Sequence, residues 1–393
     1  MTKKRYYEDA YQTACDAKVL VCKECMESSG QQFYEIILEE TVFYPEGGGQ
    51  PGDTGYLVVD GLNSVRVTDT SETQEGILHR TNLPITVGSS VHGIIDWDRR
   101  FQYSQQHSGE HIFSGIVHQL FGYDNVGFHM GQDYVTVDFN GSLSLEQIEK
   151  VESCANEAVF RDDEILITYP TQEELLNIPY RSKKTLEGSI RIVEIPGADI
   201  CACCGTHVAR TGEIGIIKVT EMENRREGCR LTILIGWQAF YDYKKKHSSA
   251  QAISNLLSVP TDKITEAVTK LLHETGALRY ALTQAKEQRL IMLSDQFKEE
   301  SQQAILFEED MTPEEVRKLC DMLMQKVTLA LVCAGDDRTG YTYVLGSKTE
   351  DVKTLSKKLN AACHGRGGGK DTMFQGRVMA TKEEIREVLI HWH

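Results

Sequence analysis

The chain has 393 residues, of which 40% are hydrophobic and 25% charged, and its net charge is −16. These values are typical of a globular protein of two to four domains. No apolar run reaches the roughly 18 residues of a membrane helix, and the amino terminus lacks the apolar core of a signal peptide. Eleven cysteines without a secretion signal favour the reducing cytoplasm. The acidic charge excludes a protein that coats nucleic acid indiscriminately, but it leaves room for a local basic site.

Residues 1–95 are predicted to form a small β-barrel. Short runs of β-branched and aromatic residues are separated by glycine and proline; they lie at Lys18–Cys22, Gln32–Leu38, Leu57–Val59 and Ser64–Thr68. Short strands with turn signals at about 8–12-residue spacing are typical of such a barrel.

Residues 96–240 are predicted to form an α+β domain. Apolar positions at helical spacing indicate a helix over Arg100–Phe121. A second helix is expected over Ser144–Phe160, with Ser144 as its N-cap. The strands expected around these helices are Tyr134–Phe139, Ile165–Tyr169 and Arg191–Ile195.

Residues 241–304 are predicted to be a helical linker that is broken at Pro260. Apolar side chains recur at 4-3 spacing from Ile264 to Met292. This stripe suits an antiparallel helix pair or a coiled coil, and it suits equally a helix packed on its own domain.

Residues 305–393 are predicted to form a carboxy-terminal α/β domain with a βαβ-like pattern. We expect strands at Leu329–Cys333 and Tyr341–Leu345, a helix over Val352–Ala362 and a glycine-rich loop over Gly365–Gly369. Between Lys353 and Lys382 there are seven basic residues and one acid, a local charge of +6.

Four potential metal ligands fall into two pairs of equal spacing. His107 and His111 lie four residues apart on the predicted helix, so both imidazoles project from one face. Cys203 and His207 form a second such pair. Three imidazoles and a thiolate are a tetrahedral donor set that suits Zn²⁺. Cys201 and Cys204 are rival thiolates, although the spacing to His207 favours Cys203.

The chain resembles the AlaX family of alanyl-tRNA editing proteins in its long form, which is related to the editing and carboxy-terminal domains of alanyl-tRNA synthetase. The segments that carry the resemblance are FYPEGGGQPGDTG (43–55), DWDRRF (96–101), HSGEH (107–111), VGFHMG (126–131) and CCGTH (203–207). The family motif usually reads CGGTH, and Cys204 replaces its first glycine here. The resemblance implies that His107, His111, Cys203 and His207 bind zinc.

The resemblance also implies hydrolysis of the ester that joins a wrong amino acid, chiefly serine, to tRNA(Ala). Thr41 and Gln50 would line the amino-acid pocket, and Thr41 suits recognition of the serine hydroxyl. Gly47, Gly48 and Gly49 would let the backbone approach the ligand. His129, and more weakly His118, are candidates for contacts to the zinc ligands or the substrate. The expected catalytic residues are therefore Thr41, Gln50 and His129, and the expected substrate-binding residues are Gly47, Gly48, Gly49 and Gln50.

The glycine-rich segment after Gly365 resembles the DHH-associated domain at the end of alanyl-tRNA synthetase. It lies in the basic stretch, so we expect phosphate contacts of tRNA at Lys357, Lys358, Arg366 and Lys370. The helical region would act as a spacer or as the arm of a homodimer. Two other functions are open: a non-catalytic zinc-containing tRNA-binding protein, and a zinc hydrolase of a small ester or amide.

Overall fold

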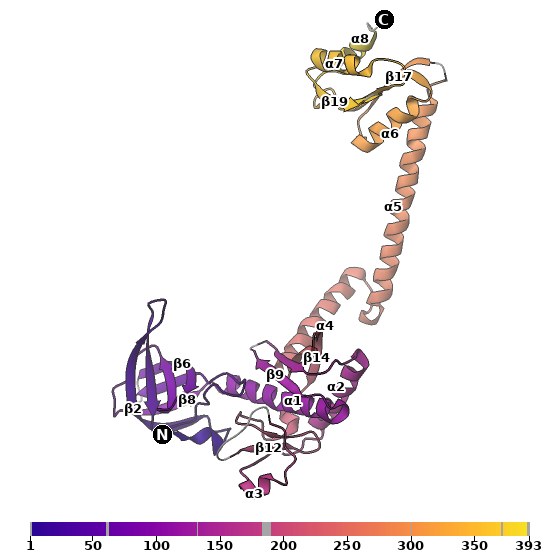
Figure 1. Cartoon of the computed structure of the whole chain (residues 1–393). Coiled ribbons are helices and arrows are strands. Elements are labelled where there is room, and N and C mark those ends of the chain that lie inside the picture. Colours follow the sequence, from indigo (N-terminus) through magenta and orange to yellow (C-terminus); the bar gives the residue numbers. More distant parts are fainter. Residues whose placement is uncertain are drawn as a thin grey trace. The chain divides into compact units, whose positions relative to one another are not determined.

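The computed structural model describes residues 2–59, 63–131, 133–182, 190–299, 301–370 and 372–390. Contacts within the chain divide it into two compact units, Met1–Ala252 and Ile253–His393. Among the described residues, no helix has both the length and the apolar character required to cross a membrane. The class is α+β, as predicted (Figure 1).

A closed barrel of antiparallel strands forms the amino-terminal part of the first unit and confirms the predicted barrel. Its strand order is β2 (Ala14–Met26), β3 (Gln32–Leu38), β7 (Ile77–Thr81), β6 (Asn63–Glu72), β5 (Gly55–Val59) and β8 (Ser90–Ile95). Alternate side chains, such as those of Val19, Ile36, Leu57 and Val91, fill the barrel core. The short strands β1 (Lys3–Lys4) and β4 (Glu40–Thr41) pair beside it in parallel.

The rest of the first unit packs two helices on a four-stranded antiparallel sheet. The helices are α1 (Trp97–Phe121) and α2 (Leu145–Phe160), and the strand order is β14 (Ile217–Arg225), β15 (Gly228–Ile235), β10 (Val135–Phe139) and β9 (Asn125–Met130). Phe113 of α1, Val151 of α2 and Ile233 of β15 share one buried core. Ser144 caps α2 as predicted, because its side chain accepts a hydrogen bond from the Gln147 amide at 3.2 Å.

A smaller three-stranded sheet lies after α2 in the sequence. Its strands are β11 (Leu166–Thr168), β12 (Ile192–Ile195) and β13 (Asp199–Ala202), and the short helix α3 (Gln172–Leu175) belongs to the same region. Gly115 lets α1 approach β13 closely, because a Cβ atom there would collide with the Ala198 carbonyl. The contact between α1 and β13 brings His111 next to Asp199.

Two helices follow the four-stranded sheet, α4 (Trp237–Leu257) and α5 (Ile264–Asp295). Along α5, Leu290 and Ser294 are the buried residues among those described. The side chains of the predicted 4-3 stripe are exposed, with Leu271 at 51%, Leu278 at 71% and Leu282 at 58%. Most of α5 is therefore not packed on its own domain, and the coiled coil stays a prediction.

The second unit contains a five-stranded sheet covered on both faces. The strand order is β16 (Ser301–Glu308), β17 (Val327–Asp336), β18 (Gly340–Ser347), β20 (Met373–Val378) and β19 (Arg366–Lys370). One face packs on α6 (Pro313–Leu323) and the end of α5, and the other on α7 (Val352–Ala362) and α8 (Lys382–Ile390).

The βαβ-like pattern predicted for this unit is present in β16, α6 and β17, because β16 and β17 are parallel neighbours with α6 between them in the chain. The strands β17 and β18 form an antiparallel hairpin. One expectation for this unit needs correction. The expected glycine-rich loop is instead the exposed strand β19, in which Gly367 pairs with Gly376 of β20. The glycines allow this pairing, since a Cβ atom on Gly367 would lie 2.9 Å from the Cα of Gly376.

Candidate metal centre

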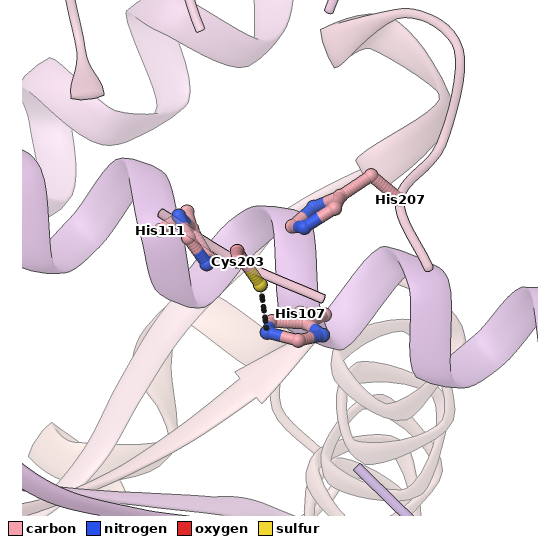
Figure 2. A group of neighbouring side chains, drawn as sticks. All are labelled: His107, His111, Cys203 and His207. Atoms are coloured by element: carbon pink, nitrogen blue, oxygen red, sulfur yellow. Dashed lines mark hydrogen bonds between the residues drawn. The ribbon is translucent and has the colours of Figure 1, made fainter. Parts of the chain in front are cut away.

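Four potential ligands converge beside α1 in the first unit (Figure 2). His107 and His111 project from one face of α1, and Cys203 and His207 come from the segment after β13. One ligand atom from each side chain lies within 4.8 Å of the other three. The Sγ of Cys203 is 3.3 Å from Nε2 of His107. The structure thus brings together the four residues that the sequence paired.

The alternative thiols occupy other positions. Cys201 is buried and forms a separate group with His111 and Asp199, whereas Cys204 is exposed. Cys203 is therefore the cysteine that completes the group containing all three histidines.

Each of the three imidazoles is held at Nδ1 by a side chain of the protein. The pairs are His107 with Gln50 Oε1 at 3.0 Å, His111 with Asp199 Oδ2 at 2.9 Å, and His207 with Ser108 Oγ at 3.1 Å. This arrangement leaves Nε2 of each ring free of its Nδ1 partner and able to bind one shared metal ion, as in protein zinc sites. The buried Nε2 of His207 has no hydrogen-bond partner among the described residues. A metal ion would satisfy that nitrogen, so the donor set fits Zn²⁺.

The protonation states of two members of the group, Cys203 and His207, suit metal binding. Burial lowers the pKa of a third member, His111, but the neighbouring Cys203 and Asp199 raise it well above its usual value. Burial alone would raise the pKa of the Cys203 thiol, but the neighbouring His107 and His111 lower this pKa well below its usual value. Burial lowers the pKa of His207 to about 3. A thiolate and a neutral imidazole are the forms in which cysteine and histidine bind a metal.

Gly205 allows the turn between Cys203 and His207 to pack on α1. A Cβ atom at this position would collide with the ring of His107. Arg191 fixes the same turn, because its Nη1 donates hydrogen bonds to the carbonyls of Cys203 at 2.7 Å and Gly205 at 3.0 Å.

A cavity of about 490 Å³ opens onto the centre. Its lining includes His107, His111 and Cys203, together with Gly48, Gly49, Val126, Phe128, Ser182, Cys201, Ala202 and Cys204. Gly48 and Gly49 have positive φ values of 60° and 84° in a turn closed by Gly47 and Gln50. A Cβ atom on Gly49 would lie 2.6 Å from the Phe128 ring, so glycine lets this turn approach β9.

Three family models match the chain. Residues 1–99 match tRNA synthetases class II (A), residues 190–231 match the threonyl and alanyl tRNA synthetase second additional domain, and residues 300–392 match the DHHA1 domain. Alanyl-tRNA editing protein AlaX-L of Pyrococcus horikoshii is 28% identical over 99% of this chain and 98% of its own length. Alanyl-tRNA editing protein Aarsd1 of Rattus norvegicus is 27% identical over 91% of this chain and 88% of its own length. The chain is a homologue of the alanyl-tRNA editing proteins.

This homology confirms the resemblance inferred from the sequence motifs. The chain also aligns over 99% of its length with alanine–tRNA ligase of Pyrococcus abyssi, at 28% identity, but spans 43% of that enzyme. The predicted relation to part of an alanyl-tRNA synthetase is thus found as well.

Several residues that the family resemblance assigned to the pocket lie elsewhere. Gln50 is fully buried and does not line the cavity. Its Oε1 accepts hydrogen bonds from Nδ1 of His107 and the Thr206 amide, each at 3.0 Å, and its Nε2 donates to the Thr206 hydroxyl at 2.8 Å. Gln50 therefore positions His107, a candidate ligand. Of the glycines, Gly48 and Gly49 reach the cavity, whereas Gly47 is not part of its lining.

Thr41 is also buried and outside the lining of the cavity. Its hydroxyl lies 2.8 Å from Nε2 of His79 and accepts a hydrogen bond from the Phe43 amide at 3.1 Å. Nδ1 of His79 donates to the Ile36 carbonyl at 3.0 Å, so the neutral ring accepts at Nε2 from the Thr41 hydroxyl. The Thr41 hydroxyl thus both donates and accepts inside the protein, and the place of Thr41 in the amino-acid pocket stays a prediction.

His129 lies on β9, paired in register with Thr136, and is exposed. The preceding residue, Phe128, packs on His107 with ring centroids 5.6 Å apart. Successive strand residues face opposite sides of a sheet, so His129 is directed away from the centre. The catalytic role of His129 stays a prediction. His118 is exposed as well and pairs with Asp124 at 2.9 Å rather than with a ligand.

The residues missed by sequence reasoning are mainly the partners of the ligands. Asp199 and Cys201 alternate along β13, and Cys203 follows at the same two-residue spacing just after the strand; this spacing was the available signal for Asp199. Nothing in the sequence pattern marked Ser108, which is adjacent to His107.

A buried ion pair joins the start of α1 to the barrel: Nε of Arg100 lies 2.9 Å from Oδ2 of Asp53.

The predicted tRNA contacts lie in the second unit. Lys357 and Lys358 are exposed on α7, and Arg366 and Lys370 are exposed on β19. α7 packs against β19 and β20, so the structure brings these four basic residues into one region of that unit.

Proposed function

We propose that the chain is a trans-editing hydrolase that deacylates mischarged tRNA(Ala), chiefly Ser-tRNA(Ala), with Gly-tRNA(Ala) as a second substrate. The main support is a four-donor centre, three members of which line a cavity, in a homologue of alanyl-tRNA editing proteins. The homology supports the expected class of enzyme, an aminoacyl-tRNA deacylase. Such a site is needed because binding alone discriminates weakly between amino acids that differ by one small group.

His107, His111, Cys203 and His207 would hold zinc, which when bound would polarise an ester carbonyl, lower the pKa of a water or orient the 3′ adenosine. Four protein ligands close the coordination sphere, which favours orientation of the substrate or displacement of one ligand. Gln50, Asp199 and Ser108 orient the three imidazoles. Gly48 and Gly49 present backbone without side chains to the cavity, so an aminoacyl group can approach the centre closely.

A deacylation assay with Ser-tRNA(Ala), Gly-tRNA(Ala) and Ala-tRNA(Ala) tests this function. We expect serine to be released while Ala-tRNA(Ala) stays largely intact. Equal rates of hydrolysis of Ser-tRNA(Ala) and Ala-tRNA(Ala) would contradict an editing function. No hydrolysis, with binding of tRNA retained, would favour a non-catalytic zinc-containing tRNA-binding protein. Cleavage of small esters or amides, without cleavage of any charged tRNA, would favour the alternative function of a zinc hydrolase of small substrates.

Zinc binding is tested separately by metal analysis. We expect about one zinc per chain, and its loss in the double variant His111→Ala/Cys203→Ala, because two of four donors are removed. The matched control is His92→Ala/Cys25→Ala, which changes one exposed and one half-buried residue of the barrel. Full occupancy in the first variant would overturn the ligand assignment.

The second unit would hold the body of the tRNA through Lys357, Lys358, Arg366 and Lys370. The exposed apolar stripe of α5 would pair with a second copy of the chain, which light scattering of the purified protein tests. We propose that the chain consists of four domains, with limits at residues 1–95, 96–240, 241–304 and 305–393. The cytoplasmic location inferred from the eleven cysteines stays a prediction.

A further inference from the structure

A second cavity, of about 720 Å³, adjoins the cavity that opens onto the metal centre. It shares Val126, Ser182 and Cys201 with the lining of the first cavity. The remaining lining residues are His118, Asp124, Asn125, Pro179, Tyr180 and Arg181. The two cavities therefore meet along a common wall.

Tyr180 gives this second cavity an aromatic surface. The residue is half-buried and packs against the buried cluster of Leu175, Ile190 and Ile192. It also lines the cavity. An aromatic side chain that is supported by a core and borders an open space suits stacking of a nucleic-acid base.

The next residue, Arg181, connects this cavity to a metal ligand. Its Nε and Nη2 donate to the two carboxylate oxygens of Asp199 at 2.8 and 2.9 Å. The same carboxylate holds Nδ1 of His111 at 2.9 Å. Backbone hydrogen bonds also join Arg181 to Ile200 at 2.8 Å and to Ala202 at 2.9 Å. A ligand in the second cavity would thus be held at a defined position relative to the metal centre.

Polar groups in the lining of the cavity complement this aromatic surface. Nδ1 of His118 lies 2.9 Å from Oδ1 of Asp124, and both side chains are exposed. This pairing leaves Nε2 of His118 available for a hydroxyl or a base. The exposed side chain of Val126 stands between the two cavities and adds an apolar contact.

We propose that the second cavity binds the 3′-terminal nucleoside of the aminoacyl-tRNA, with Tyr180 stacking on its base. This inference rests on the proposed function. In the substrate, the ester carbonyl carbon is bonded directly to a ribose oxygen. An aminoacyl group at the metal centre therefore requires its nucleoside in an adjoining space, and this cavity adjoins it. Its volume falls in the range of small-molecule sites, about 300–1,000 Å³.

Calorimetric titration with a non-hydrolysable analogue tests the proposal without relying on turnover. The probes are 3′-(L-serylamino)-3′-deoxyadenosine and the same seryl amide on a ribose that lacks the base. We expect Tyr180→Ala to weaken binding of the adenosine probe about 5- to 150-fold, the range of a lost base stack. Tyr180→Phe should keep the affinity, because the ring is retained.

Tyr134→Ala is the matched control, since Tyr134 is an exposed tyrosine that lines neither cavity. Zinc content, measured for every variant, reports on the integrity of the centre. The proposal is overturned if Tyr180→Ala binds the adenosine probe like wild type, if both probes weaken equally, or if wild type does not prefer the probe with a base. It is also overturned if Tyr180→Phe is as weak as Tyr180→Ala.

These outcomes are separable from a failure of the proposed function. Wild-type protein that deacylates Ser-tRNA(Ala) normally, while Tyr180→Ala leaves both binding and KM unchanged, rejects the nucleoside site alone. Wild-type protein that binds the probe through Tyr180 but hydrolyses no mischarged tRNA rejects the hydrolase alone.

Discussion

Oε1 of Gln50 lies 3.0 Å from Nδ1 of His107, and this hydrogen bond joins the turn after β4 to the helix that carries two of the candidate ligands. Gln50 is fully buried, and its Nε2 donates at 2.8 Å to the hydroxyl of Thr206, which lies between Cys203 and His207 in the chain. One side-chain amide thus fixes both the tautomer of His107 and the turn that carries the other two ligands.

Replacing Gln50 by leucine should weaken zinc binding about 10- to 100-fold, because His107 loses the partner that orients its ring. Zinc affinity is measured by competition with a chromophoric chelator. Gln32→Leu is the control, since Gln32 is an exposed barrel residue that bonds the Tyr34 hydroxyl. Unchanged zinc affinity in Gln50→Leu would show that the hydrogen bond does not support the ligand.

Replacing Gly205 by alanine should displace His107 and release zinc while the rest of the unit stays folded, since the new Cβ would collide with the imidazole. Metal analysis and circular dichroism of the purified variant measure both effects. Gly276→Ala is the control, because a Cβ at that helical position meets no atom within 4 Å. A fully zinc-loaded Gly205→Ala protein would contradict the packing described for this turn.

Replacing Thr41 by valine should lower the free energy of unfolding by about 1–3 kcal/mol, because Nε2 of His79 and the Phe43 amide lose a buried partner. The preference for serine over alanine should stay unchanged. Urea titration and deacylation assays measure the two quantities. A reduced preference at wild-type stability would restore the role in serine recognition that the family resemblance implied.

The stability of the chain should fall in acid partly through His79. Burial lowers the pKa of His79 from 6.5 to about 4, so the unfolded chain binds the proton more tightly. The stabilisation from neutral His79 is complete above about pH 6.5 and is lost as the pH falls towards 4. Between pH 7.5 and 4.5 this amounts to about 2–3 kcal/mol.

Urea titrations of wild type and His79→Gln at the two pH values test this dependence. The variant should lose less stability than wild type on acidification, by about that amount. His92→Gln is the control, because His92 is exposed on the same barrel and pairs with Asp16. Equal acid sensitivity in wild type and His79→Gln would mean that other groups carry the pH dependence.

Reversing Lys357, Lys358, Arg366 and Lys370 to glutamate should raise KM for mischarged tRNA with little change in kcat, because remote phosphate contacts bind ground and transition states alike. The slope of log K against log salt should flatten by about one unit for each lost contact. Steady-state kinetics at several salt concentrations measure both effects. An acceptor-stem minihelix should be hydrolysed at the wild-type rate.

The control for these reversals changes four other exposed lysines of the second unit to glutamate: Lys263, Lys270, Lys318 and Lys348. This variant carries the same change in net charge. If the control raises KM as much as the test variant, the effect comes from overall charge and the four residues on α7 and β19 are not a tRNA site.

The sequence by itself determined the features that depend on local periodicity. His107 and His111 lie four residues apart, and a helix places such residues on one face whatever surrounds them. Short β-branched and aromatic runs separated by glycine and proline predicted the barrel over the first 95 residues for a similar reason, since strand and turn preferences are also local. The choice of Cys203 among three cysteines followed from the same four-residue spacing.

Tertiary structure alone decided the contacts between distant segments. Thr41 is hydrogen-bonded to His79, 38 residues away, and Gln50 is hydrogen-bonded to His107, 57 residues away. His129 is directed away from the centre because Phe128 occupies the inward position of β9. The glycine segment after Gly365 is a strand because β20 offers Gly376 at the facing position. Each of these outcomes depends on which side chains meet after folding, and periodicity along the chain carries no information about such partners.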